Sequence, residues 1–499
     1  MSQQRCPGLK NALSMTARSI STPYPNVMTS DALVTILRTG DVPAEFAPHV
    51  IRFLDETPPQ MVRAAIEDAA SADVPVETIK AQLQAWAMKF NSGIDELLVE
   101  AAFSRQPSYK SPLVPLYLVD EAGVATQIAE INLLGRDGCA VLFGRQFEWP
   151  FSGSGPHCTY PGIPYFLEDM RPQGFLGRQF AQRHASSMQL PEAPNEWSDA
   201  DIWAALTSKG ADQVGNLIVG EAAYRQFLLS AQQDVHVYRA DEVDSVYPFL
   251  AGQAMAGAAN GPLVGGEFPK FTAARLIDGE PQHVIVKFTA DDDTQRSRRW
   301  SDLLVCEHIA SNVLRDQLGI DAARSRICQA AGRTFLEVVR FDRHGAFGRS
   351  PVCSWASLNA GLIGLAGDPW PKGAARMQQH GWLDTSAVGT VEKIWHFGRL
   401  ISNSDMHDGN LSFVPGLAVA PVYDMLPMAY SPQRDGGLVD REYFPQPPLA
   451  SERQAWKASA DAAIKFWRRA STDERISPSF RSICRTNCER LAGVLADRS

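Results

Sequence analysis

A polar turn between two apolar segments constrains this chain more than any other stretch of its sequence. Residues 403–410 read Asn-Ser-Asp-Met-His-Asp-Gly-Asn, and the strand-like segment 411–413 follows. Asp405 and Asn410 are five positions apart, and Asp424 comes fourteen residues after Asn410, just past a second apolar run. This is the layout of a kinase catalytic loop, in which one Asp accepts a hydroxyl proton while an Asn and a second Asp bind Mg²⁺ through hard oxygen ligands. Taken alone, the same residues also describe an ordinary polar turn.

Two upstream segments carry residues suited to phosphate. Residues 261–271 form a Gly-containing loop that ends in Lys270 and passes into an apparent strand. Glycines such as Gly265 and Gly266 let backbone N–H groups approach phosphate oxygens closely, although a tight turn between strands fits this loop equally well. Residues 283–288 alternate as a strand should and contain Lys287 among apolar residues. A lysine there must be paired, or must reach water at the sheet edge; in a kinase it would bind nucleotide phosphates.

The segments between these motifs follow in a definite order. Residues 300–318 predict an amphipathic helix that carries Glu307, and Gly319 stands where a helix-ending glycine belongs. Residues 334–339 predict a strand, and 340–345 a polar break at which the chain crosses between lobes. A helix is predicted over 387–401, with its core face at Val391, Ile394, Trp395, Phe397 and Ile401. Phosphate loop, strand lysine, acidic helix, hinge strand and catalytic loop thus appear in the order that a two-lobed kinase requires.

The segment before residue 200 reads as mainly β. Strands are predicted over 113–119, 127–134 and 139–143, with a turn at 120–123. Residues 153–162 are rich in Gly, Ser and Pro and predict a loop. The aromatic residues of 164–176 alternate with Gly and Pro, and we interpret this stretch as a packed loop.

The N-terminal part predicts helices over 32–38, 44–54, 61–70 and 76–90. A helix-turn-helix is conceivable from this layout. However, residues 31–100 hold five Lys and Arg against twelve Asp and Glu, a net charge of −7. Binding driven by nucleic-acid phosphates needs the opposite sign, so a helical interaction module is favoured. The first 30 residues, which lack acids, predict a disordered tail, with a transit peptide as the alternative.

Composition narrows the class of protein. The 499 residues carry a net charge of −9, which argues against a general polyanion binder, and no run is long and apolar enough for a membrane span. The eight cysteines are scattered, and we expect reduced thiols in a cytoplasmic protein. Only Cys484 and Cys488 are close, and they lack the partners of a zinc site.

Five short motifs together resemble the HipA family of bacterial serine/threonine kinases. They are Gly265-Gly266-x-x-Pro269-Lys270, Val286-Lys287-Phe288, Arg340-Phe341-Asp342-Arg343, Asn403-x-Asp405-x-His407-x-x-Asn410 and Tyr423-Asp424. Residues 165–176 and the extended N-terminus resemble the YjjJ branch of that family, whose members often begin with a helix-turn-helix. The kinase resemblance covers about residues 200–430, with a weaker match over 112–200.

The resemblance implies a role for each matched residue. Asp405 corresponds to the catalytic base, Asn410 and Asp424 to the Mg²⁺ ligands, and Lys287 to the phosphate-binding lysine. His407 corresponds to a histidine that supports the loop. Nucleotide binding would further involve the phosphate loop with Gly265, Gly266 and Lys270, and an adenine site at Val339, Arg340 and Phe341.

Three departures from the family pattern matter. Family members commonly carry a Ser just before the phosphate loop, whose phosphorylation switches the kinase off; here Pro262-Leu263-Val264 stands instead. Glu307 lies about one helical turn from the expected acidic position, which leaves its ion pair with Lys287 open. The acidic N-terminus opposes DNA binding.

The sequence therefore predicts an α+β, two-lobed kinase-like fold of HipA type. We expect a tail over 1–30, a helical module over 31–110, a β-rich subdomain over 111–212, a kinase N-lobe over 213–345 and a helical C-lobe over 346–499. The expected activity is transfer of the γ-phosphoryl of Mg²⁺–ATP to a protein Ser or Thr in a toxin or stress-regulation setting, with an antitoxin as a candidate partner. The alternative is a catalytically weak, pseudokinase-like regulator that binds a protein or DNA through its N-terminal module.

Overall fold

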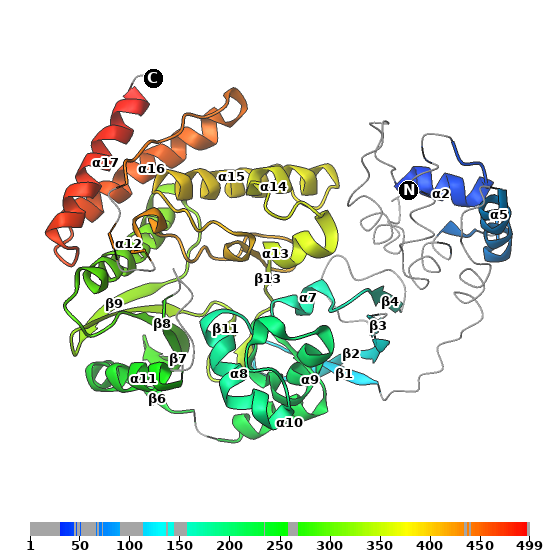
Figure 1. The fold of residues 1–499 in the computed structure, drawn as a ribbon, viewed down its shortest axis with the longest axis horizontal. Helices are drawn as coiled ribbons and strands as arrows, with labels where there is room; N and C mark the ends of the chain where they lie inside the picture. The colour runs from blue at the N-terminus through cyan, green and yellow to red at the C-terminus, as the bar shows by residue number, and fades with distance from the viewer. Residues whose placement is uncertain are drawn as a thin grey trace. The chain divides into compact units, whose positions relative to one another are not determined.

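The computed structural model separates the chain into two compact units (Figure 1). It describes residues 30–43, 69–71, 73–89, 113–135, 138–143, 157–233, 235–257, 268–433, 437–438 and 441–496, with isolated positions at 46, 50 and 66. Unit 1 comprises 1–117, 127–168 and 358–365, and unit 2 comprises 118–126, 169–357 and 366–499. Helices and sheets occur in both units, which makes the fold class α+β.

Two helices of unit 1 match the sequence predictions closely. Helix α2 (Ser30–Thr39) ends at Gly40, whose φ of 70° suits a glycine. Helix α5 (Val76–Lys89) is the last of the predicted series. Leu33 and Leu37 of α2 and Ile79 of α5 are fully buried. The predicted tail over 1–30 and the helices predicted over 44–54 and 61–70 lie outside the described residues, apart from single positions.

A β-sheet forms the second part of unit 1. Its strands β1 (Val114–Val119), β2 (Ala125–Leu133), β3 (Cys139–Phe143) and β4 (His157–Tyr160) follow one another in the order β4-β3-β2-β1. Strand β3 pairs antiparallel with both neighbours. The first three strands confirm the prediction, but the loop predicted over 153–162 is wrong at 157–160. Tyr160 packs edge-on against Phe166 of helix α7 (Tyr165–Glu168), and this aromatic contact holds the fourth strand although its residues show no strand-like alternation.

Unit 2 continues with helices where the sequence suggested a packed loop. Helix α8 (Gly174–Met188) begins inside the stretch 164–176, so that interpretation is wrong. Helix α9 (Asp199–Lys209) starts at a capping box formed by Ser198 and Asp201, and α10 (Glu221–Ala231) follows strand β5 (Leu217–Val219). The segment 111–212 is therefore β-rich only as far as residue 160.

A five-stranded sheet lies at the centre of unit 2. Its order is β6 (Val237–Tyr238), β7 (Lys270–Ile277), β8 (Glu280–Phe288), β10 (Arg333–Val339) and β9 (Ser325–Ala330). All pairings are antiparallel except that between β6 and β7. Helices α11 (Val243–Gly257) and α12 (Gln295–Leu318) lie on opposite sides of it (Figure 1). Aromatic side chains fill the space between α11 and the sheet, among them Tyr247, Phe271, Phe288 and Phe335.

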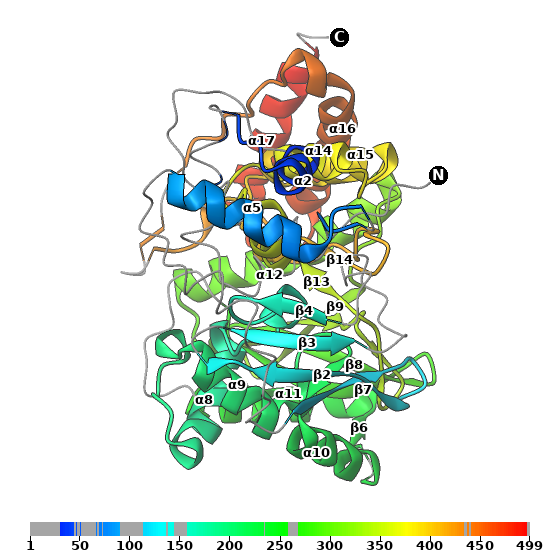
Figure 2. The same ribbon diagram turned by 90° about the vertical axis from the view of Figure 1, so that its right-hand side faces the viewer.

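Helices make up the rest of unit 2. They are α13 (Trp355–Leu358), α14 (Trp370–Gln379), α15 (Thr385–Leu400), α16 (Arg453–Thr472) and α17 (Pro478–Ala496). Helices α14 to α17 gather on one side of the five-stranded sheet, with α12 between them and the strands (Figure 2). Short strand pairs join β11 (Arg343–His344) to β12 (Gly348–Arg349) and β13 (Cys353–Ser354) to β14 (Ser412–Phe413). The prediction of a two-lobed arrangement, sheet first and helices second, is confirmed within this unit.

The predicted core face of α15 is largely correct. Val391, Ile394 and Phe397 are buried, whereas Trp395 is only half-buried. No helix in the described residues combines the length and apolarity that crossing a membrane needs.

Candidate active site

Lys287 lies at the end of β8 and is buried. Its Nζ donates to both carboxylate oxygens of Glu307, at 2.7 and 2.8 Å. Burial lowers the pKa of the Lys287 ammonium, and Glu307 opposes that effect. The lysine is therefore paired rather than extended to water, and Glu307 of α12 forms the ion pair that the helical offset had left open.

The helix that carries Glu307 is longer than predicted. It begins at Gln295, five residues before the predicted start, because Thr294 caps it by accepting the backbone N–H of Ser297 at 3.1 Å. Its other end confirms the prediction, since Gly319 adopts a φ of 62°.

A second positive charge stands beside Lys287. Lys270 lies opposite Lys287 in the β7–β8 register, and the Phe268 ring lies 6.0 Å from the Lys287 ammonium. Two cations on neighbouring strands favour a polyanionic ligand. Gly265 and Gly266, the glycines of the predicted phosphate loop, lie outside the described residues.

Asp424 approaches the same lysine from the helical side of unit 2. One of its carboxylate oxygens contacts the Lys287 ammonium, and its side chain is about one-third exposed. Its backbone φ is 54°, an uncommon conformation for an aspartate. Lys287 is thus shared between Glu307 and Asp424, which joins the sheet, α12 and the segment after β14 at one point.

Asn403 connects the two acidic positions through its side-chain amide. Its oxygen accepts the backbone N–H of Asp405 at 3.0 Å, and its nitrogen donates to the carbonyl of Asp424 at 3.3 Å. The residue is buried. The sequence analysis assigned no role to Asn403. The pattern that could have indicated one is an asparagine two positions before an aspartate, just after the end of a helix.

The remaining loop residues are held by local hydrogen bonds. The Asn410 amide nitrogen donates to the backbone carbonyl of Asp405 at 2.8 Å, and among the described residues no partner is recorded for its amide oxygen. His407 accepts the Gly409 N–H at 3.1 Å and caps a short 3₁₀ helix over 408–410. The side chains of Asp405 and His407 are exposed. In this structure His407 supports the loop through that contact.

Gly398 lets the loop approach α15. A Cβ atom at this position would collide with the side chain of Met406, which stands between Asp405 and His407, and would crowd Met425. The absence of a side chain on α15 therefore fixes how closely the loop packs on that helix.

The predicted hinge at 339–341 uses its backbone donors within the fold. The Val339 N–H donates to the Arg324 carbonyl at 2.8 Å, and the Arg340 N–H donates to the His283 backbone carbonyl at 2.9 Å. The Phe341 ring lies 6.1 Å from the Tyr423 ring, which brings the hinge next to Asp424.

The Arg340 side chain belongs to a buried charge cluster. Its guanidinium donates to both oxygens of Asp342, at 2.9 and 2.8 Å. Arg343 donates to Asp342 at 2.8 Å, and the Gly215 N–H donates to it at 3.1 Å. The polar break predicted at 340–345 is therefore an ion network inside unit 2, and any nucleotide contact by Arg340 would come from its backbone.

An open cleft of about 590 Å³ lies beside the loop. Apolar and charged side chains share its wall, and the Phe444 ring is 66% exposed. The lining residues are Trp395, Arg399, Ser402, Asn403, Ser404, Asp405, Met406, His407, Ala429, Glu442, Tyr443 and Phe444.

Comparison with known proteins defines the class to which this fold and site belong. Residues 263–492 match the HipA-like C-terminal domain, and residues 110–228 match the middle domain of YjjJ-like toxins. The toxin YjjJ of Escherichia coli (strain K12) is 37% identical over 385 residues, which cover 76% of this chain and 84% of that protein. The chain belongs to the YjjJ-like family of HipA-related toxins, and the resemblance stated from the sequence is confirmed.

Two solved structures are also similar. HipA of Shewanella oneidensis MR-1, solved in a toxin–antitoxin complex with HipB and its operator DNA, matches with a TM-score of 0.49 and 16% identity over 77% of this chain and 98% of that one. The proinflammatory kinase CtkA of Helicobacter pylori matches with a TM-score of 0.32 and 11% identity, covering 45% and 88%. At these TM-scores the likenesses decide nothing about the function of this chain.

Proposed function

We propose that this protein is an ATP-dependent serine/threonine kinase that acts as a toxin. The observation that carries the proposal is the shared contact of Lys287 with Glu307 and Asp424, linked through Asn403 to Asp405. A phosphoryl-transfer site needs a lysine for the phosphates, a metal-binding carboxylate and a base for the hydroxyl. Contacts that run from Lys287 through Asp424 and Asn403 to Asp405 connect the lysine, the carboxylate and the base.

The residues present fit Mg²⁺ and ATP. Asp424 offers a partly exposed carboxylate, and the bond from the Asn410 nitrogen to Asp405 turns the Asn410 amide so that its oxygen remains as a ligand. Lys287 and Lys270 would bind phosphate oxygens, and the hinge at 339–341 would line the adenine site. Mg²⁺, when bound, would neutralise part of the phosphate charge.

Asp405 is the proposed base. Its backbone N–H donates to Asn403 and its backbone carbonyl accepts from Asn410, while its carboxylate is exposed at the cleft beside the loop. An acceptor Ser or Thr bound in this cleft would donate its proton to Asp405 as its oxygen attacks the γ-phosphorus, while the bond from that phosphorus to the bridging oxygen breaks and ADP leaves. The cleft is open, which supports a polypeptide acceptor.

A partner protein is part of the proposal. Because the family to which this chain belongs is one of toxins, we propose that an antitoxin protein is its partner. The net charge of −7 over residues 31–100 favours protein over DNA as the direct contact of the N-terminal module.

Transfer of labelled phosphate tests the activity. The purified full-length protein is incubated with Mg²⁺ and γ-labelled ATP in a cell extract, and labelled acceptors are identified by mass spectrometry. Asp405→Asn should lower transfer by about 10²–10⁴-fold because it removes the base, while nucleotide affinity stays nearly unchanged.

Asp461→Asn makes the same chemical change at an exposed position of α16 and serves as the matched control. Near-wild-type transfer by Asp405→Asn would remove Asp405 from its role. Wild-type protein that binds Mg²⁺–ATP but labels nothing would favour the pseudokinase-like regulator instead.

A further inference from the structure

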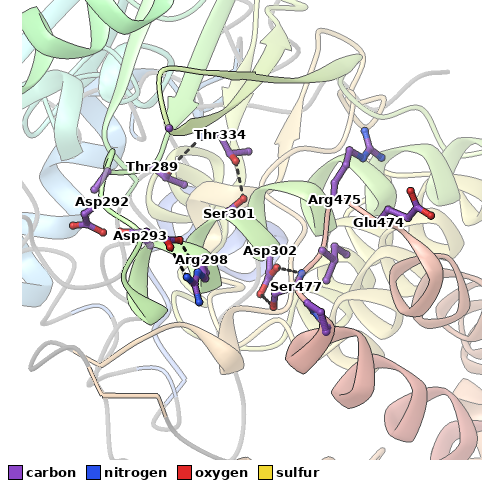
Figure 3. Close-up of a pocket in the computed structure, with 15 residues that line it drawn as sticks. Thr289, Asp292, Asp293, Arg298, Ser301, Asp302, Thr334, Glu474, Arg475 and Ser477 are labelled. Atoms are coloured by element: carbon purple, nitrogen blue, oxygen red, sulfur yellow. Dashed lines mark hydrogen bonds and ion pairs between the residues drawn. The ribbon is translucent and has the colours of Figure 1, made fainter.

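Helix α12 contacts different partners at its middle and near its start. Glu307, in its middle, holds Lys287. About one and a half turns nearer its start, Asp302 is buried and faces the segment that joins α16 to α17 (Figure 3). Because an α-helix is stiff over so short a distance, whatever fixes Asp302 also fixes Glu307.

Ser477 binds Asp302 with two hydrogen bonds. Its backbone N–H donates to one carboxylate oxygen and its hydroxyl to the other, both at 2.7 Å. Ser477 immediately precedes α17. Figure 3 shows this contact beside a polar cavity of about 230 Å³, lined by the start of α12, by Thr334 of β10 and by residues 474–478. Asp302 and Ser477 both line this cavity, so their two direct hydrogen bonds form part of its wall.

Arg299, one turn earlier on α12, also contacts α17 and the segment after Asp424. Its guanidinium donates to the Tyr430 carbonyl at 3.2 Å and lies 4.4 Å from the centroid of the Phe480 ring in α17. Tyr430 stands six residues after Asp424, and its hydroxyl accepts a hydrogen bond from Asn487 of α17 at 2.8 Å. The start of α12, the segment after Asp424 and the last helix thus meet in one buried group.

We infer that Asp302 and Ser477 are positioning residues, which hold α12 so that Glu307 reaches Lys287 without an added phosphate. In protein kinases the corresponding Lys–Glu ion pair must form before phosphoryl transfer. Phosphorylation of the activation loop often stabilises the position of the helix that carries the Glu. Here the hydrogen bonds from Ser477, in the segment between α16 and α17, stabilise the position of α12. This inference rests on the proposed function for its meaning, but the contact itself can be tested without transfer.

Ser477→Ala removes little volume, but it removes the hydroxyl that donates to the buried Asp302 carboxylate, contacts the Ser479 hydroxyl at 3.2 Å and accepts the Phe480 N–H at 3.4 Å. We expect amide hydrogen exchange of residues 300–312 to become roughly tenfold faster, and the dissociation constant for Mg²⁺–ATP to rise by a similar factor. Ser477→Thr keeps the hydroxyl and should restore both values to within about twofold. Asp316→Asn breaks the exposed ion pair between Asp316 and Arg469, another link from α12 to α16, and should change neither.

The readouts separate positioning from stability. A structural role alone would speed exchange throughout unit 2 and leave the protein that remains folded with normal nucleotide affinity. Exchange over 300–312 that is unchanged in Ser477→Ala, or that rises equally everywhere, would overturn the inference. If the wild-type protein binds no Mg²⁺–ATP, the proposed function fails, while the exchange comparison still decides whether Ser477 fixes α12.

Discussion

Single side chains that bond in two directions hold the candidate site together. Asn403 joins the backbones of Asp405 and Asp424, and Lys287 joins the carboxylates of Glu307 and Asp424. In such a network each member orients its neighbours, so the loss of one residue affects more than one contact.

Asp424→Ala tests the metal position at this scale. If Asp424 contacts nucleotide only through Mg²⁺, the substitution should weaken Mg²⁺–ATP binding far more than binding of metal-free ATP. Calorimetric titrations with and without Mg²⁺ measure the difference. Asn410→Ala should show the same pattern more mildly, because it removes no charge. Equal losses in the two titrations would place Asp424 outside the metal site.

The sequence identified the residues of this site better than it identified their supports. Asp405, Asn410, Asp424 and Lys287 stood out because their polar side chains fall at fixed spacings beside apolar strands. Gly398 gave no such signal, because a glycine within a helical pattern does not reveal which side chain approaches it. Ser477 was equally hidden, since only the tertiary fold brings a residue of the α16–α17 segment to α12.

At the scale of elements, the charge cluster after β10 shows what local patterns leave out. The polar residues 340–343 predicted a crossing between lobes, and in the structure they also form a buried network that reaches back to Gly215, which no local pattern indicates. The failed reading of 164–176 has a related cause. Aromatic residues and glycine occur both in loops and at the starts of helices. Here burial of the aromatic side chains against distant residues stabilises the helices α7 and α8.

Asp342→Asn should destabilise unit 2. The substitution takes from the buried Arg340 and Arg343 one of their two carboxylate partners and leaves them only Asp212, and removal of a partner from a buried ion pair typically costs about 3–5 kcal/mol. Urea unfolding of the full chain, followed by tryptophan fluorescence, gives the change in the free energy of unfolding. Asp316→Asn, at an exposed ion pair, should cost less than about 1 kcal/mol. Equal losses in the two variants would contradict a structural role for the cluster.

The same carboxylate predicts how stability depends on pH. Burial alone would raise the pKa of Asp342, but Arg340 and Arg343 outweigh it and hold that pKa well below its usual range. The unfolded chain therefore takes up the proton at a higher pH than the folded chain does. The stability that Asp342 contributes should be complete above about pH 4 and decline as the pH falls further, and Asp342→Asn should flatten that decline.

At the scale of the whole molecule, the sequence predicts that phosphorylation of the phosphate loop does not regulate this protein. Residues 260–271 contain no Ser, Thr or Tyr, so a hydroxyl-directed kinase cannot place a phosphate there. Prolonged incubation with Mg²⁺–ATP should therefore leave this segment unmodified and should not progressively abolish activity through it. Intact-mass measurement and peptide mapping at successive times decide the matter. A phosphopeptide with its phosphate inside 260–271 would show this reading to be wrong.

The contact between Asp302 and Ser477 also bears on how the protein is made. The two residues are 175 positions apart, so a ribosome adding about 5–20 residues per second completes Ser477 roughly 9–35 seconds after Asp302. Only late in that interval, once residue 424 has been added, does the growing chain contain Lys287, Glu307, Asp405 and Asp424, and it then still lacks the segment that we infer to align them. A truncated chain that ends between residues 424 and 477 would carry all four of these residues without Ser477, and we expect it to bind Mg²⁺–ATP more weakly than the full chain.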